Sequence, residues 1–175
     1  MNGGPKHHGV GLRPAVFLLL AAVVLLSGCG FHLRGAADLP FKSLYVQAPP
    51  TSLFGTQLKR VIVSSSQTEV VEEPKGAEAI LQVLDERREK EILSLSGAGR
   101  VREFQLRYRV RYRVVDQKQR ELVPTSEIVL RRDFSFNDQE ALSKESEEAL
   151  LFRDMQTDAV QQLLRRLQAT KLAAS

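Results

Sequence analysis

The chain has 175 residues, of which 43% are hydrophobic and 26% charged, so it can form one ordinary core, and bulk disorder is excluded. It contains no Trp and a single Cys, which excludes an internal disulfide framework. Lys and Arg outnumber Asp and Glu by 25 to 21, and a formal charge of +4 is too small to require a polyanionic partner unless the basic residues cluster.

The first 28 residues have the features of a secretory signal peptide. Lys6 and Arg13, with no acidic residue near them, precede an unbroken apolar run from Ala15 to Leu26. A membrane-spanning helix needs about 20 apolar residues, and this run is shorter. A basic start followed by roughly 7–15 apolar residues is typical of a signal peptide, so residues 1–28 are excluded from the fold prediction.

A sequence with the form of a bacterial lipobox, Leu26-Ser27-Gly28-Cys29, ends the apolar run. Lipidation needs a thiol at the last position because sulfur accepts the diacylglycerol, and the small residues before it let the peptidase approach the bond. The alternative is a structural Cys that follows an apolar stretch by chance. We predict that Cys29 becomes the mature N-terminus, with an N-palmitoyl and an S-diacylglycerol group, because two or more acyl chains give stable anchoring.

The residue after Cys29 bears on which membrane receives the anchor. In enteric-type lipoproteins Asp at that position favours retention in the inner membrane, whereas this chain has Gly30. We therefore expect a protein of the outer membrane that is lipid-anchored on the periplasmic side.

The mature sequence shows no internal repeat and no low-complexity linker, which indicates one domain. Residues 29–42 mix Gly, Pro and charges without a period and predict an extended lead from the lipid anchor. The domain is expected to span residues 43–172, and residues 173–175 form a short tail.

The domain begins with a predicted strand and helix. Residues 43–48 are rich in strand formers and stop at Pro49-Pro50. Thr51 or Ser52 can cap a helix that fades in the serines at 64–66. The apolar stripe of this helix has the spacing i, i+4, i+7, i+8 and consists of Phe54, Leu58, Val61 and Ile62.

Residues 67–76 predict a loop that can hold a short extended piece around Val70, and a strand begins near Ala77. The odd-numbered residues Leu81, Val83, Leu93 and Leu95 are expected on one face of that strand. The charged segment between them, residues 85–91, either points outward or marks a bulge, and periodicity leaves both open. Residues 96–99 (SGAG) predict a hairpin turn, because the lysine and the following helix of a phosphate-binding loop are missing.

Residues 102–115 alternate strictly, which is typical of a half-buried antiparallel strand. The even positions carry the apolar and aromatic residues Phe104, Leu106, Tyr108, Val110, Tyr112 and Val114. After a turn at 116–120, alternation resumes to Phe136, with Pro124 early in the run. Since proline is confined to edges, strand starts or bulges, this strand is an edge or begins after Pro124.

The C-terminal part predicts a long amphipathic helix, capped at residues 137–138 and running over 142–172 without Gly or Pro. Its apolar stripe is interpreted as core: Phe152, Met155, Ala159, Val160, Leu163, Leu164 and Leu167. The order strand, helix, three strands, helix predicts an α+β fold, a two-layer sandwich in which two helices pack on one face of a four-stranded, mostly antiparallel sheet.

The sequence argues against catalysis. Acylation of Cys29 removes the only thiol nucleophile, and His32 is the only histidine left after cleavage. One histidine beside the anchor cannot build a Ser-His-Asp arrangement or a His-based metal site. We therefore expect no enzyme, no metal and no cofactor.

An arginine stripe is the feature with chemical promise, and it occupies the odd positions of the alternating strand: Arg107, Arg109, Arg111 and Arg113. One interpretation is a solvated face whose charges are offset by Glu103, Glu127 and Asp133 on neighbouring strands. The other is contact with a phosphate-rich or carboxylate-rich surface, because guanidinium pairs bidentately with both groups. Nucleic acid does not fit a secreted, lipid-anchored protein. Further basic candidates are Arg100, Arg102 and Lys144.

The run from Cys29 to Gly35, CGFHLRG, resembles the start of the mature proteins of the LptE family, the lipopolysaccharide-assembly lipoproteins of Gram-negative outer membranes. The stretch from Ala141 to Leu167 resembles the last helix of that family. Together with the element order, the resemblance covers essentially the whole mature chain.

The resemblance implies a lipoprotein that sits as a plug inside the β-barrel protein LptD, assists folding of that barrel and can bind lipopolysaccharide. The pair delivers lipopolysaccharide to the outer leaflet. The seven basic candidates would then contact lipid A phosphates or the barrel, and charge reversal at Arg109 and Arg111 is expected to weaken lipopolysaccharide binding. The alternative is an outer-membrane lipoprotein that binds another periplasmic ligand and has no barrel partner.

Overall fold

The computed structural model describes residues 39–170, apart from the side chain of Asp138. The predicted signal peptide, Cys29 and the tail at 173–175 lie outside the described residues. No helix within residues 39–170 has the length and apolar character needed to cross a membrane.

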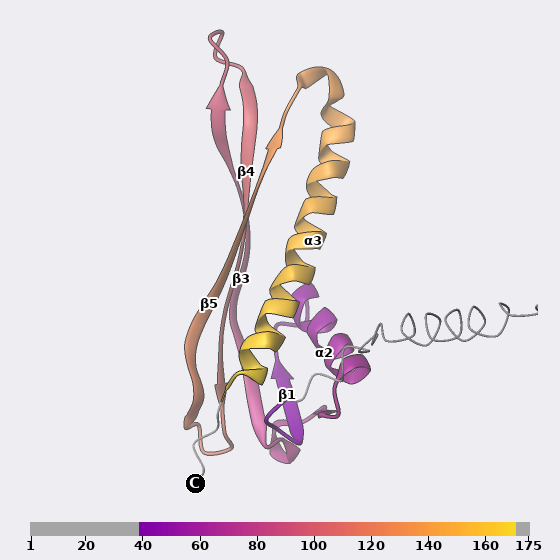
Figure 1. The fold of residues 1–175 in the computed structure, drawn as a ribbon, viewed down its shortest axis with the longest axis vertical. Coiled ribbons are helices and arrows are strands. Elements are labelled where there is room, and N and C mark those ends of the chain that lie inside the picture. Colours follow the sequence, from indigo (N-terminus) through magenta and orange to yellow (C-terminus); the bar gives the residue numbers. More distant parts are fainter. Residues whose placement is uncertain (1–38, 171–175) are drawn as a thin grey trace, which may run out of the picture. The chain divides into compact units, whose positions relative to one another are not determined.

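One layer of the structure is a five-stranded sheet in the order β2-β1-β3-β4-β5 (Figure 1). β1 pairs in parallel with β2 and β3, whereas β3, β4 and β5 form an antiparallel meander. The strands are β1 (Ser43–Gln47), β2 (Glu69–Val71), β3 (Ala79–Leu95), β4 (Val101–Val115) and β5 (Glu121–Ser135). The α+β class and the mostly antiparallel sheet are therefore confirmed.

The fifth strand corrects the predicted count of four. β2 lies within the segment predicted as a loop, where only a short extended piece around Val70 was expected. It is tied to the start of β1 by a backbone hydrogen bond from Glu69 N to Lys42 O of 2.9 Å, and Leu44 pairs with Val70. A strand of three residues is too short to show period-2 alternation, so the sequence pattern misses it.

The second layer consists of α2 (Leu53–Ser65) and α3 (Ala141–Gln168), which share one face of the sheet as predicted (Figure 1). Ser52 caps α2 by accepting a hydrogen bond from Gly55 N at 2.9 Å. Within the described residues there are also two short 3-10 turns, η1 (Pro74–Gly76) and η2 (Asp138–Glu140). The predicted bounds of 142–172 for the last helix differ from its observed end at Gln168.

The hydrophobic core lies between the two layers. The even-numbered residues of β4 point toward the helices, and Tyr108 and Tyr112 are the largest fully buried side chains. The stripes of both helices pack against this cluster as predicted, and Val61 does so although it is only partly buried. Phe41 is 3% exposed and belongs to the same cluster, so packing begins before residue 43.

A β-bulge explains a wrong prediction in β3. The register between β3 and β4 shifts between Val83 and Asp85, which moves the helix-facing positions from odd to even residues. Leu81 and Val83 are buried, but Leu93 and Leu95 are 47% and 56% exposed instead of sharing their face. The charged segment 85–91 therefore begins at a bulge, and its residues Arg87, Glu89 and Glu91 also point outward onto the open face, so both interpretations hold in part.

A polar network ties α2 to the sheet just past this bulge. Glu86 accepts hydrogen bonds from Ser52 Oγ at 2.6 Å and from Tyr108 Oη at 2.7 Å. Burial raises the pKa of Tyr108 well above its ordinary value, and the hydrogen bond to Glu86 raises this pKa further. The start of α2, β3 and β4 thus meet at one carboxylate.

We predict that Tyr108→Phe lowers the free energy of unfolding by about 1–3 kcal/mol, because the partly buried carboxylate of Glu86 loses a hydrogen-bond donor. Urea denaturation measures this change. Tyr112→Phe is the matched control, because the Tyr112 hydroxyl has no hydrogen-bond partner within residues 39–170, and the variant should change stability by less than about 0.5 kcal/mol.

The same pair of variants gives a pH test. Because the folded-state pKa of Tyr108 lies above its unfolded value, this contribution to stability is complete below about pH 10 and declines as the pH rises further. Tyr108→Phe should therefore lose less stability than the parent protein above pH 10. Equal alkaline losses in both proteins would contradict this account of Tyr108.

Candidate functional site

The predicted arginine stripe lies on the open face of the sheet, opposite the helices, and most of it is paired with carboxylates. Arg107 reaches two residues of β3, with its Nη1 3.4 Å from Glu89 Oε2 and 3.1 Å from Glu91 Oε1. The Arg109 guanidinium lies 3.6 Å from carboxylate oxygens of Glu89 and Glu127, so it joins β3 and β5. These contacts cross-link three strands.

The other two arginines of the stripe differ from each other. Arg113 Nε donates to Gln82 Oε1 at 2.6 Å, and its Nη1 lies 3.8 Å from Glu121 Oε1. Arg111 is exposed, and no ion pair joins it to a carboxylate of the described chain, although Asp85 and Glu127 stand opposite it in register. Arg111 is therefore the member of the stripe whose guanidinium is most accessible to a ligand.

The expected partners of the stripe are mostly different from the observed ones. Of Glu103, Glu127 and Asp133, only Glu127 pairs with an arginine of the stripe. Glu103 accepts from Ser94 Oγ, and Asp133 accepts from Gln105 Nε2. The main partners, Glu89 and Glu91, lie in the charged segment of β3, whose register the sequence pattern left open.

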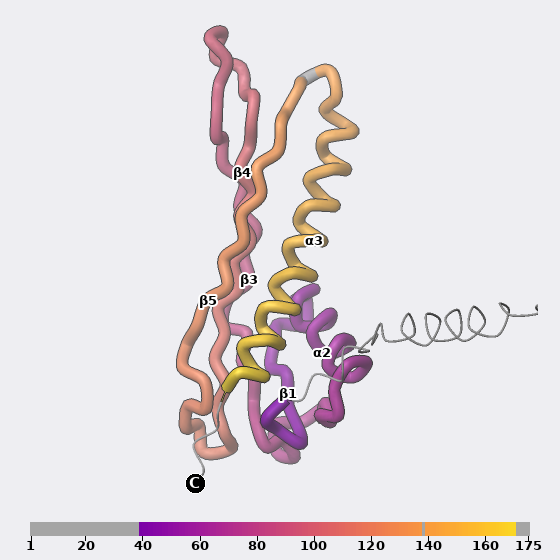
Figure 2. Tube along the Cα trace, in the orientation of Figure 1, coloured from indigo at the N-terminus to yellow at the C-terminus, as the bar shows by residue number. Residues whose placement is uncertain are grey.

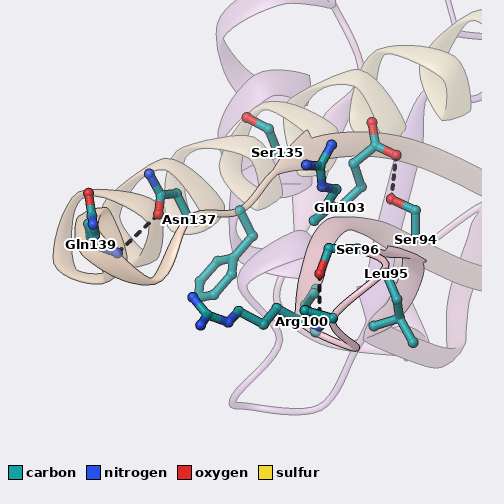
Figure 3. Close-up of a pocket in the computed structure, with 12 residues that line it drawn as sticks. Ser94, Leu95, Ser96, Arg100, Glu103, Ser135, Asn137 and Gln139 are labelled. Atoms are coloured by element: carbon teal, nitrogen blue, oxygen red, sulfur yellow. Dashed lines mark hydrogen bonds between the residues drawn. The ribbon is translucent and has the colours of Figure 1, made fainter.

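The tip of the β3–β4 hairpin projects past the turn between β5 and α3 (Figure 2). Two further basic candidates, Arg100 and Arg102, lie at this tip. A cavity of about 860 Å³ lies there between the hairpin and the end of β5, and both Arg100 and Arg102 line it. Figure 3 shows Arg100 extending toward the turn that carries Asn137 and Gln139. In the β3–β4 hairpin itself, the Ser96 hydroxyl accepts a hydrogen bond from Arg100 N at 3.1 Å and stabilises the hairpin turn.

Lys144 lies close to the same end of the sheet but is engaged. It stands in the first turn of α3, where its Nζ donates to Glu147 Oε2 at 2.7 Å and lies 3.3 Å from Ser135 Oγ. Its side chain is only 14% exposed. Ser135 also lines the tip cavity, so the structure brings Arg100, Arg102 and Lys144 to one end of the molecule.

Apolar side chains lie beside the cations of the tip. Leu95 lines the cavity and is 56% exposed. Phe136, also in the lining, packs edge-on against Phe104 at 5.2 Å between ring centroids. Guanidinium groups beside exposed apolar surface suit an amphipathic anion, whose acidic group pairs with arginine while its apolar part contacts the hydrophobic side chains.

Two cations that the sequence analysis missed lie on the helix-facing side of β3. Lys90 Nζ sits 4.2 Å from the centroid of the Phe104 ring and donates to Glu148 Oε2 at 2.6 Å. The Arg88 guanidinium lies over the Tyr108 ring at 5.8 Å and donates to Gln156 Oε1 at 2.8 Å. These contacts join the sheet to α3. Beyond the bulge the even-numbered residues of β3 face the helices, and a bulge assumed at this point would have predicted that Arg88 and Lys90 lie on the helix-facing side.

The described part of the chain also bears on metal binding. No group of three or more His, Cys, Asp or Glu side chains there could hold a metal ion. Residues 39–170 have three charged or polar regions. They are the open face with its ion-paired arginines, the hairpin tip with cations beside apolar side chains, and the polar contacts between the sheet and α3.

We predict that Arg107→Ala lowers the free energy of unfolding by about 1 kcal/mol, because the side chain is 22% exposed and pairs with two carboxylates of β3. Arg111→Ala is the matched control and should cost less than about 0.5 kcal/mol. Denaturant unfolding at low and at 1 M salt gives both values, and the cost at Arg107 should shrink at high salt. Equal costs for the two variants would contradict the pairing described here.

Comparison with known proteins points to one family. The LptE family profile, described as lipopolysaccharide-assembly, matches residues 41–167. An LPS-assembly lipoprotein LptE from Photorhabdus laumondii is 27% identical over 157 residues, which cover 89% of this chain and 85% of the relative. A protein of the same name from Pectobacterium atrosepticum is 27% identical over 161 residues, with 89% and 86% covered.

Solved structures agree with the fold. The solution structure of a lipoprotein B from Nitrosomonas europaea matches with a TM-score of 0.71 at 47% identity, over 80% of this chain and 91% of that chain. The crystal structure of the rare lipoprotein B from Shewanella oneidensis gives 0.61 at 24% identity, over 73% and 95%, and supports the fold alone. Because the matched range 41–167 takes in all five strands and both helices, this chain belongs to the LptE family.

Proposed function

We propose that this chain is an outer-membrane lipoprotein of lipopolysaccharide assembly that plugs and helps to fold an LptD-like β-barrel. The pair delivers lipopolysaccharide to the outer leaflet. The observation that carries this proposal is the family match over residues 41–167, which is nearly the whole described part of the chain. The role is structural and non-catalytic, and it involves no cofactor.

The open face of the sheet supports the plug role. Its arginines and carboxylates interleave across β3, β4 and β5, so the middle of this face is a mixed-charge surface. A long, rigid surface of this kind is suited to a polar, water-lined barrel interior, where an apolar face would be poorly solvated and a single-sign face would repel like charges.

Lipopolysaccharide binding is the second part of the proposal. Lipid A carries phosphates beside acyl chains, and the tip offers Arg100 and Arg102 beside Leu95 and Phe136. Lys144 is a weaker contributor because Glu147 already neutralises it. On the open face, Arg111 is the better candidate for lipid contact, whereas Arg107, Arg109 and Arg113 are better candidates for structural or barrel contacts.

The anchor and the location complete the proposal. Cys29 carries the N-palmitoyl and S-diacylglycerol groups, and Gly30 after it directs the protein to the outer membrane, where the domain lies on the periplasmic side. The other function, binding of a different periplasmic ligand without a barrel, would use the same anchor. Only the presence or absence of the barrel partner separates the two.

We expect affinity purification of the tagged full chain from detergent-extracted membranes to recover a large β-barrel protein in about equal amounts. Recovery of the chain alone would favour the ligand-binding alternative. Cys29→Ser is the control for the anchor: it should leave the protein unlipidated by mass spectrometry and move it out of the membrane fraction.

We expect the double variant Arg100→Glu, Arg102→Glu to capture lipopolysaccharide at least about fivefold less well, because two charge-assisted contacts become repulsive. Binding is measured by co-purification with immobilised protein. Arg60→Glu, an exposed change on α2, is the matched control and should bind normally.

The stripe is tested separately through Arg111→Glu, alone and together with Arg109→Glu. Reduced capture would assign lipid contact to the open face. Normal capture by both would limit lipopolysaccharide contact to other surfaces, while circular dichroism checks that each variant folds.

A further inference from the structure

The long strand β3 has a free edge over most of its length. β1 pairs with β3 only from Ala79 to Gln82, and β1 itself ends at Gln47 before Pro49-Pro50. From Val83 to Leu95, no strand within residues 39–170 lies on that side of β3. The backbone N–H and C=O groups of alternate residues in this stretch point away from β4 and are therefore available to another strand.

This edge lacks proline, one of the features that commonly protect strand edges. The other long edge, β5, carries Pro124, whereas register shifts with β4 occur along both β3 and β5. β3 has neither Gly nor Pro. It also exposes large apolar side chains to 44–57%, namely Leu84, Ile92, Leu93 and Leu95.

Two cavities flank the same edge. One, of about 470 Å³, lies where β1 ends and is lined by residues that include Ala48, Pro49 and Leu84. The other, of about 460 Å³, lies between β3 and α3 and is lined by residues that include Arg88, Ala149 and Phe152. A strand added beside β3 would start at the first cavity, where β1 ends, and would occupy the same side of β3 as β1 does. Every second side chain of that strand would point toward the second cavity.

The charges along the edge favour a basic occupant. The side chains that border it in β3 or the second cavity comprise six carboxylates and three bases: Asp85, Glu86, Glu89, Glu91, Glu145 and Glu148, with Arg87, Arg88 and Lys90. Asp85, Glu89, Glu91 and Glu148 already form ion pairs with cations of the chain. Glu91 is 54% exposed at its side chain, and Glu145 is exposed without an ion pair to any described residue. A second copy of the chain would bring the same excess of carboxylates and be repelled.

We propose that the free edge of β3 binds an extended, basic segment of another polypeptide by strand addition. Main-chain hydrogen bonds to Val83–Leu95 supply the affinity, and long basic side chains with apolar stems fit between Phe152 and the carboxylates of α3. This interaction is independent of lipopolysaccharide binding, so it can fail without affecting the proposed function.

The test uses a capped nine-residue peptide of alternating lysine and valine and the ¹⁵N-labelled full chain in detergent. We expect saturable binding that slows amide exchange in residues 84–95 more than in β5. The same peptide with every backbone amide N-methylated keeps its charge but loses its hydrogen-bond donors, and should bind at least about tenfold more weakly. A peptide with glutamate in place of lysine should bind more weakly as well.

Glu145→Lys tests the cavity between β3 and α3 and should weaken binding about two- to fivefold. Asp154→Lys is the matched control: it makes the same charge change on an exposed site nine residues along α3, half a turn around the helix, and should leave binding unchanged. Equal binding of the N-methylated peptide, slowed exchange outside residues 84–95, or no binding at millimolar peptide would each overturn the proposal.

Discussion

The antiparallel ladder between β3 and β4 is the constraint on which the rest of this structure depends. It runs from the Ile80–Val115 pair to the Leu95–Val101 pair and thereby fixes which side chain stands opposite which over the whole length of the sheet. The ladder sets the core face of β4, with Tyr108 and Tyr112 inward, and at the same time aligns Glu89 with Arg107 on the open face. One register thus determines both surfaces, because side chains alternate between the faces of a strand.

The bulge in this ladder divides the space between sheet and helices into two parts. Before it, β3 contributes apolar residues such as Leu81, and the packing against α2 is apolar. Beyond it, the helix-facing positions of β3 carry Glu86, Arg88 and Lys90, which contact α2, α3 and aromatic rings through hydrogen bonds, an ion pair and cation–π contacts. Removing one partner of such a contact leaves a polar group poorly solvated, so this part is held by specific pairs rather than by apolar burial alone.

The strongly periodic segments were the predictable part of the fold. Residues 102–115 and the stripe from Phe152 to Leu167 place their apolar residues unambiguously, because one face of each element is buried and the other is solvated. β2 is too short to show a period, and one extra residue at the bulge reverses the parity of β3. Both features depend on pairing with distant strands, which a single-strand pattern does not report.

The candidate site was predictable in composition but not in pairing. The arginine stripe follows from alternation, yet its partners in β3 follow only from the register of the hairpin. Counting outward from the turn at 96–100 puts Glu89 opposite Arg107 and Asp85 opposite Arg111, as the structure has them. The centre of the turn therefore decided which side chains of β3 stand opposite Arg107, Arg109 and Arg111, because the bulge between Val83 and Asp85 lies beyond these pairs. Because three of its four arginines meet carboxylates or an amide within the sheet, the stripe leaves mainly Arg111 for a ligand, whereas Arg100 and Arg102 line the cavity where the ladder ends, at the hairpin tip.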